Sequence, residues 1–226
     1  MTLDEAYRAQ LELLARWEGA GERQAGWKVG LTARAMQAQQ GVYEPVFGFL
    51  LLSGHRPSGT TFDFSALIRP GFENELCLTL GAPLAGPGVT LEQARVAVSH
   101  VAPALEIIEK RGEFGADLAL SLADNAQQKA FVTGAAVPLG TLDPAEVTLE
   151  LWVNGVLQER ARGAEVLGTP IASIAWLADK LAGFGRRLEP GTRVMSGSFT
   201  RQYDLHCGDV VEARFGPLGP VSAEFH

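Results

Sequence analysis

Three glutamates interrupt apolar segments of this 226-residue chain. Glu73 and Glu75 stand at the start of the run 73–80, and Glu106 lies inside the run 104–108. Because side chains alternate along a strand, Glu73 and Glu75 should point to one face. Like charges held side by side repel, and each would take up a proton unless a cation neutralised them. Three carboxylates on buried strands therefore suit a hard divalent ion such as Mg²⁺, with positions left for water and substrate.

A simpler alternative places Glu73 and Glu75 on the wet face of a half-exposed strand, where no metal is needed. Glu106 argues against it, because apolar residues flank Glu106 on both sides. A zinc site is not expected, since no histidine lies at metal-ligand spacing from a cysteine or another histidine.

Lys28 lies in a short apolar strand with glycines near it on both sides. A lysine there can hold a substrate carboxylate, or it can move a proton if its pKa is lowered. The alternative is a lysine on a sheet edge that discourages aggregation. The glycine- and hydroxyl-rich stretch 196–201 could bind an anion, although such stretches are mostly ordinary turns. For Asp124 and Asn125, helix capping is preferred over ligand orientation.

The composition permits one buried core and excludes several functions. Hydrophobic residues make up 46% of the chain, and the net charge of −7 argues against a nucleic-acid partner. No apolar run reaches membrane-spanning length, and the N-terminus lacks the apolar core of a signal peptide. The two cysteines provide no disulfide framework, so we expect a cytoplasmic protein. Hydrolase-elbow, Walker A and dinucleotide motifs are absent from the sequence.

Capping, turn and periodicity signals predict an α+β domain with a curved mixed β-sheet, a half-barrel or roll, and a few flanking helices. We expect a single catalytic domain over residues 1–226. Helices are predicted at 3–19, 32–40, 90–99 and 169–183, and strands at 27–29, 46–52, 73–80, 147–153, from 156 onward, 209–215 and 221–225.

Seven segments together resemble the 2-oxo-4-pentenoate hydratase and 4-oxalocrotonate decarboxylase family, within the fumarylacetoacetate hydrolase superfamily. They are GWKVGLT at 26–32, ENE at 73–75, PALEII at 103–108, DN at 124–125, GAEVLGTP at 163–170, GSFT at 197–200 and GD at 208–209. The resemblance implies the expected half-barrel and a lyase of aromatic meta-cleavage catabolism. Its substrates would be 2-hydroxy-2,4-dienoates or 2-oxo-alkenoates.

Roles for individual residues follow from the same resemblance. It implies Mg²⁺ or Mn²⁺ bound by Glu73, Glu75 and Glu106, with Lys28 as the catalytic residue. It also implies substrate contacts from Leu31, Val46, Ser198, Thr200 and Arg201. A homo-oligomer, or a complex with a paralogous lyase, would be the expected assembly.

Two departures from the family pattern leave the reaction open. Hydratases of the family usually have an aspartate at the position of Val46. Decarboxylases of the family resemble this chain in having an aliphatic residue there. Arg201 favours a hydratase instead, because an arginine can bind the distal carboxylate of a dicarboxylic 2-oxo-alkenoate. The chain also begins at what resembles the second helix of its relatives. A hydratase is therefore the leading hypothesis, with a decarboxylase second and a weakly active partner subunit third.

Overall fold

The computed structural model describes residues 1–33, 37–38, 41–112 and 117–226, so most of the helix expected at 32–40 lies outside the described residues. The described helices are α1 (Leu3–Gly19), α3 (Leu91–Ala97), α4 (Leu118–Ala123) and α5 (Pro170–Ala182). None of them has the length and apolar character needed to span a lipid bilayer.

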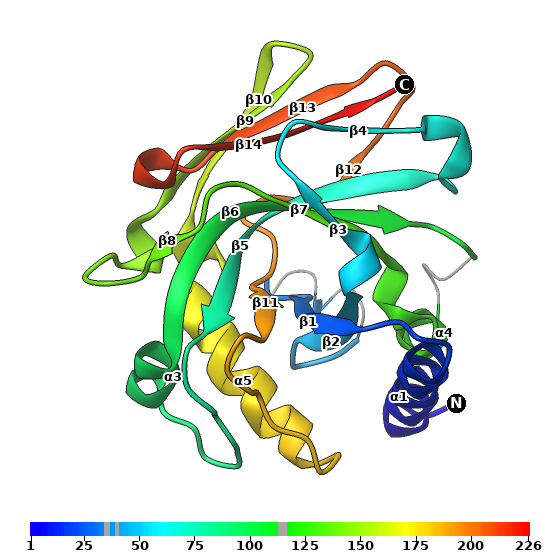
Figure 1. Cartoon of the computed structure of the whole chain (residues 1–226), viewed down its shortest axis with the longest axis vertical. Coiled ribbons are helices and arrows are strands. Elements are labelled where there is room, and N and C mark those ends of the chain that lie inside the picture. The colour runs from blue at the N-terminus through cyan, green and yellow to red at the C-terminus, as the bar shows by residue number, and fades with distance from the viewer. Residues whose placement is uncertain (34–36, 39–40, 113–116) are drawn as a thin grey trace.

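Two β-sheets form the body of the molecule (Figure 1). The larger sheet runs in the order β2–β1–β11–β5–β6–β7–β3, with β12 paired to β5 and β8 to β6. The smaller sheet runs in the order β10–β9–β13–β14–β4. Strands of the larger sheet are β1 (Gln24–Gly30), β2 (Val46–Leu51), β3 (His55–Pro57), β5 (Pro70–Leu80), β6 (Val98–Glu109), β7 (Gln128–Thr133), β8 (Val137–Pro138), β11 (Arg193–Met195) and β12 (Tyr203–Asp204). Strands of the smaller sheet are β4 (Thr60–Phe62), β9 (Thr148–Val153), β10 (Val156–Arg162), β13 (Val210–Arg214) and β14 (Pro220–Phe225).

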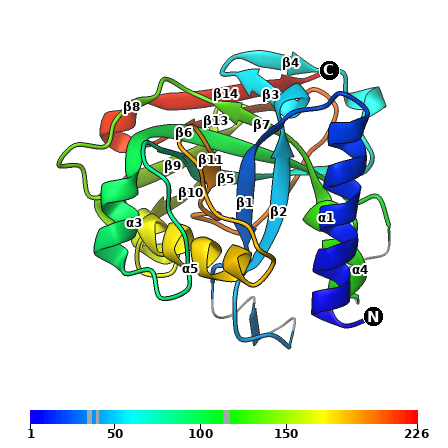
Figure 2. The same cartoon turned by 60° about the horizontal axis from the view of Figure 1, so that its bottom comes forward.

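The larger sheet is mixed and strongly curved, which confirms the predicted fold class. The long strands β5 and β6 bend around α5, whose apolar face lies against the sheet (Figure 1). Strand β1 pairs in parallel with β11 and antiparallel with β2, so it lies inside the sheet. At one end, α1 runs beside α4, while α3 and α5 lie together at the other (Figure 2).

Local sequence signals account for the element boundaries. Capping boxes begin α1 at Thr2 and α3 at Thr90, as predicted. The hairpin β9–β10 turns at Asn154 and Gly155, whose φ angles of 52° and 73° are those of the expected tight turn. Helix α3 ends at Ala97, earlier than predicted, because the pairing of β6 with β5 begins at Val98.

Candidate metal-binding active site

The three predicted carboxylates meet because β5 and β6 are antiparallel neighbours. In the register of this pair, Glu73 lies opposite Glu106 and Glu75 lies opposite Ala104. Side chains that face each other across two strands share a face of the sheet, and so do alternate residues of one strand. Each glutamate accordingly offers an oxygen within 4.8 Å of an oxygen from each of the other two.

These carboxylates are buried and poorly provided with hydrogen bonds. Glu75 and Glu106 are both 0% exposed. One oxygen of Glu75 accepts a hydrogen bond from the Gly197 backbone N–H at 2.8 Å. The other, and both oxygens of Glu106, have no hydrogen-bond partner among the described residues. Burying a carboxylate without donors is costly, so these all-oxygen ligands fit a hard divalent cation.

Burial also disturbs the acidity of the cluster. It raises the pKa of Glu75 well above its ordinary value, and the charges of Glu106 and Glu73 raise it further. The pKa of Glu106 is raised chiefly by burial, although the Lys28 ammonium opposes the shift. Both shifts have the physical cause that was expected from the sequence, because burial and like charges disfavour the ionised form.

Lys28 faces the carboxylates from the neighbouring part of the sheet. Its Nζ lies 3.4 Å from Glu106 Oε1, and the residue is only 5% exposed. Burial alone would lower the pKa of Lys28, but the charges of Glu106, Glu73 and Glu75 outweigh it and raise the value. Gly48 leaves room for the lysine, because a Cβ there would lie 3.3 Å from Lys28 Cε. The alternative of a lysine on an exposed sheet edge is wrong.

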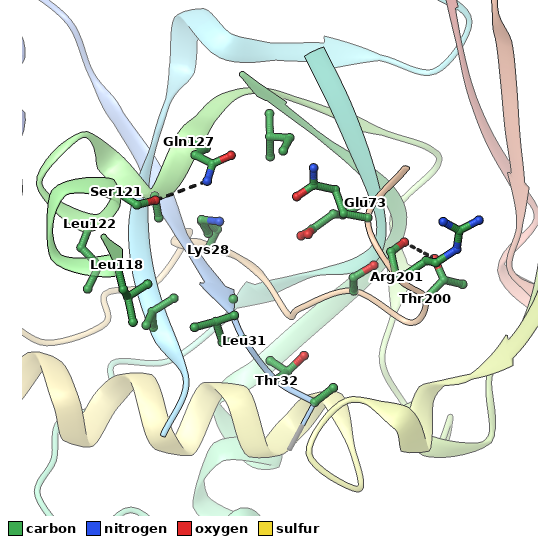
Figure 3. A pocket seen from close by; sticks show the side chains of 17 residues that line it. Lys28, Leu31, Thr32, Glu73, Leu118, Ser121, Leu122, Gln127, Thr200 and Arg201 are labelled. Carbon is green, nitrogen blue, oxygen red and sulfur yellow. Dashed lines mark hydrogen bonds between the residues drawn. The ribbon is translucent and has the colours of Figure 1, made fainter. Parts of the chain in front are cut away.

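A cavity of about 210 Å³ opens beside this cluster (Figure 3). Lys28 and Glu73 contribute to its walls, together with all the residues expected to contact substrate: Leu31, Val46, Ser198, Thr200 and Arg201. Val46 starts β2 opposite Gly30 of β1, which brings the valine next to the Lys28 strand. The structure therefore places every predicted site residue in or beside one cavity.

The turn that carries Ser198 and Thr200 is tied to β5 through Asn74. The Asn74 amide donates to Thr200 Oγ1 at 2.8 Å, and the Asn74 carbonyl accepts from the Phe199 N–H at 2.8 Å. Gly197 is needed at the start of the turn, because its φ is 103° and a Cβ would lie 2.4 Å from Thr32 Cγ2. Hydrogen bonds to β5 thus fix the position of the turn at the edge of the cavity.

Arg201 is exposed, and its charged group turns away from Lys28 and Glu73 (Figure 3). The guanidinium lies 4.3 Å from the centre of the Tyr203 ring. Tyr203 in turn donates a hydrogen bond from its hydroxyl to Glu159 at 2.6 Å. A contact between Arg201 and a distal carboxylate of the substrate stays a prediction.

The predicted cap is confirmed at Asp124, which occupies the C-cap position of α4 and donates its backbone N–H to the Leu120 carbonyl at 3.1 Å. Asp117 caps the other end of α4, the N-terminus, where its side chain accepts from the Leu120 N–H at 2.9 Å. The Asp124 carboxylate pairs with Arg111 at 2.7 Å. The Asn125 side chain accepts from the Phe49 N–H at 2.7 Å and donates to the Phe49 carbonyl at 3.0 Å. The side chains of Asp124 and Asn125 therefore make tertiary contacts that no local sequence pattern predicts.

Four polar residues of the cavity wall were not among the predicted site residues: Thr32, Ser121, Gln127 and Gln202. Ser121, on α4, and Gln127, just before β7, both line the cavity. Ser121 lies inside the run 118–123, which has the appearance of an ordinary helix, and Gln127 belongs to no recognisable motif. No signal in a single sequence marks either residue.

Comparison with known proteins identifies the family of this chain. The model of the fumarylacetoacetate (FAA) hydrolase C-terminal family matches residues 25–226. The chain belongs to this family. A 4-oxalocrotonate decarboxylase of Pseudomonas putida is 38% identical, and the alignment covers 100% of this chain and 86% of the relative. A 2-oxo-hept-4-ene-1,7-dioate hydratase of Escherichia coli is 33% identical over 100% of this chain and 87% of the relative. Both of these FAA hydrolase family members are lyases, which is the predicted enzyme class.

Solved structures of the family carry divalent ions. The 4-oxalocrotonate decarboxylase from Pseudomonas putida G7, complexed with magnesium and adipate, is 38% identical and has a TM-score of 0.97, over 100% of this chain and 87% of that chain. The same enzyme was also solved with calcium and acetate, with a TM-score of 0.96 over 100% of this chain and 86% of that chain.

Proposed function

We propose that this chain is a divalent-metal-dependent lyase acting on 2-hydroxy-2,4-dienoates or their 2-oxo-alkenoate tautomers. The observation that carries the proposal is the convergence of Glu73, Glu75 and Glu106 beside a cavity lined by Glu73 and Lys28. Oxygens of Glu75 and Glu106 have no donor among the described residues. Mg²⁺ or Mn²⁺ is the proposed ion, since the ligands are all carboxylate oxygens.

Each residue has a role that its position permits. Glu73, Glu75 and Glu106 would hold the ion, which supplies stabilisation of the negative charge that develops on a 2-oxo acid. The Lys28 ammonium adds a second positive charge and can hold or move a proton beside the substrate.

The remaining walls of the cavity would fix the substrate in place. The Ser198 and Thr200 hydroxyls provide hydrogen bonds at one wall. Leu31 and Val46 provide apolar contact with the hydrocarbon part of the substrate.

Hydration is the reaction that we propose first. Hydration requires a polar group that orients water toward a carbon away from the carboxylate end of the substrate. Val46 cannot be that group, because its side chain has no polar atom. Ser121 and Gln127 line the same cavity and provide such groups. Four further relatives with the activity of hydratases are 32–33% identical to this chain over nearly its full length.

Decarboxylation is the second candidate, and a specific observation favours it. Val46 lies in the cavity wall, and an apolar wall favours loss of a charged carboxylate as neutral CO₂. Two relatives that are decarboxylases are 38% identical to this chain, against 32–33% for the hydratases. Both reactions require the same stabilised negative charge, so the site described here serves either one.

The assembly and location remain part of the proposal. We propose that residues 1–226 act as one catalytic unit in the cytoplasm, as a homo-oligomer or in complex with a paralogous lyase. Size-exclusion chromatography with light scattering, alone and with a candidate paralogue, would test the assembly. A weakly active partner subunit would show turnover only in the mixture.

The test of the activity uses purified protein with Mg²⁺ or Mn²⁺ and two substrates, 2-hydroxypentadienoate and 4-oxalocrotonate. A hydrated product from the first substrate supports hydration, whereas CO₂ from the second supports decarboxylation. The absence of either product with both ions, in a folded protein, would contradict the proposed lyase activity.

A further inference from the structure

Three consecutive residues beside the cavity have a backbone conformation that L-amino acids rarely adopt. The φ angles of Asn125, Ala126 and Gln127 are 63°, 49° and 65°. Left-handed backbone is unfavourable for non-glycine residues, and asparagine tolerates it best. A run of this kind persists only where surrounding contacts impose it, and such conformations cluster at functional sites.

The contacts that impose it come from the Asn125 side chain. Asn125 is 5% exposed, and its side-chain amide bonds to the backbone N–H and carbonyl of Phe49. The amide therefore pairs with β2 in the way that the backbone of a neighbouring strand would. Gly48 permits this approach, because a Cβ there would lie 3.0 Å from Asn125 Oδ1. The segment is therefore fixed against the strand that begins with Val46.

The result of this conformation is that Gln127 lines the active-site cavity (Figure 3). Its Nε2 donates to Ser121 Oγ at 3.4 Å. Ser121 is itself 6% exposed and belongs to α4. Figure 3 shows Gln127 and Ser121 on the same side as Lys28, with Glu73 and Thr200 on the other side.

The wall around this polar pair is apolar. Leu118, Leu122, Val46 and Ala126 line the cavity there, and none of them can orient water. Gln127 has a donor that serves Ser121, and its carbonyl oxygen remains as an acceptor for a hydrogen of water. An acceptor directs a lone pair of that water toward the substrate.

We propose that Gln127, held by Ser121, positions the water molecule that adds to the substrate. The inference rests on the proposed hydration and assigns its water-orienting group. In the step, the water oxygen forms a bond to C4 of a 2-oxo-3-alkenoate as the C3=C4 π bond opens and one O–H bond of the water breaks, and C3 receives a proton. The sum is the addition of one H₂O with no external oxidant or reductant.

A purely structural role for the segment would give different results, and three variants separate the two roles. Gln127→Met keeps the side-chain length but removes the amide. Gln127→Gly removes the side chain and relieves the backbone conformation. Gln158→Met is the matched control, because Gln158 is an exposed glutamine on β10, in the other sheet. Each variant is assayed for the kcat and KM of hydration, for deuterium incorporation into the substrate in D₂O, and for Tm.

We expect Gln127→Met and Gln127→Gly to lower the kcat of hydration by about 100-fold, which is the usual cost of a misplaced reactant. Deuterium incorporation, which needs no added water at C4, should stay within about twofold of the wild type. The Tm of Gln127→Gly should equal or exceed that of the wild type, because the glycine adopts positive φ freely. The control should match the wild type in every measurement.

Several results would overturn the inference. Unchanged hydration in Gln127→Met would do so while leaving the lyase activity intact. A parallel fall in hydration, deuterium incorporation and Tm would assign Gln127 a structural role. A wild type that incorporates deuterium but only releases CO₂ would remove the water-positioning role and retain the lyase. A wild type with neither activity would overturn the proposed function itself, and the inference with it.

Discussion

Two buried glutamates of β6, Glu106 and Glu109, differ in the number of hydrogen-bond donors and cations around their carboxylates. Glu109 is 2% exposed and is surrounded by donors. Its carboxylate lies 3.3 Å from a guanidinium nitrogen of Arg111 and 3.3 Å from the Lys129 ammonium, and it accepts from the Ile68 N–H at 3.2 Å. A buried carboxylate with two cations and a backbone donor is fully compensated.

Glu106 is buried to the same degree but is compensated only in part. It is 0% exposed, it lies opposite Glu73 in the sheet register, and the cation that the structure places beside it is Lys28. The comparison shows that burial of an acid does not by itself indicate a site. What distinguishes the metal-binding candidate is the excess of negative charge and of oxygens without donors.

The largest effect is expected from Glu75→Gln. The substitution keeps the shape of the side chain but removes one of three converging charges, so divalent-ion affinity should fall by at least about 100-fold and turnover should be lost. Stability without metal should not decrease, because one like-charge repulsion disappears. Isothermal titration with Mn²⁺ and a thermal melt measure both quantities. If the variant binds Mn²⁺ as tightly as the wild type, Glu75 is not a metal ligand and does not differ from Glu109 in function.

Lys28→Met should have the next largest effect. It removes the positive charge beside the substrate, so kcat should fall by about 10²–10⁴-fold, the usual range for a proton-transferring group. The Tm measured with saturating Mg²⁺ should change little, because methionine fills similar space. Turnover that falls only as much as the folded fraction would assign Lys28 a structural role.

Val46→Asp sharpens the choice between the two reactions. An aspartate in that wall adds a water-orienting group and a charge, so hydration should appear or increase severalfold and CO₂ release should fall. Product analysis by NMR on both substrates measures the ratio. If neither activity changes, position 46 does not select the reaction.

Glu109→Gln should affect stability alone. Loss of its charge leaves Arg111 and Lys129 without their shared partner, so the free energy of unfolding should fall by about 1–3 kcal/mol. The value lies below that of a fully buried ion pair because the Lys129 side chain is 42% exposed. Mn²⁺ affinity should remain within about twofold of the wild type, since Glu109 is not one of the three converging carboxylates. A large loss of affinity would contradict the division of roles.

The sequence allowed much of the site to be predicted, because its signals are local or belong to a family pattern. Alternation along β5 brought Glu73 and Glu75 to one face, and the apolar neighbours of Glu106 indicated its burial. Capping boxes and the Asn154–Gly155 turn gave the helix starts and the hairpin. These features depend on residues close together in the chain.

The features that were missed depend on contacts distant in sequence. Asn125 bonds to Phe49, and Gln127 reaches the cavity through a left-handed backbone that its own residue type does not favour. Glu109 looks like Glu106 in the sequence, because each follows an apolar stretch, and only the fold brings Lys129 to one of them. Periodicity cannot reveal which buried acid is fully compensated.

The central claim is that the incompletely compensated carboxylates of β5 and β6 form a divalent-cation site. The most direct measurement is a Mn²⁺ titration of three proteins: the wild type, Glu106→Gln and Glu109→Gln. Electron paramagnetic resonance measures the concentration of free Mn²⁺ at each step. The account predicts one bound Mn²⁺ per chain in the wild type and in Glu109→Gln, with affinity reduced by at least about 100-fold in Glu106→Gln. Equal affinity in all three proteins, or a loss caused by Glu109→Gln instead, would contradict it.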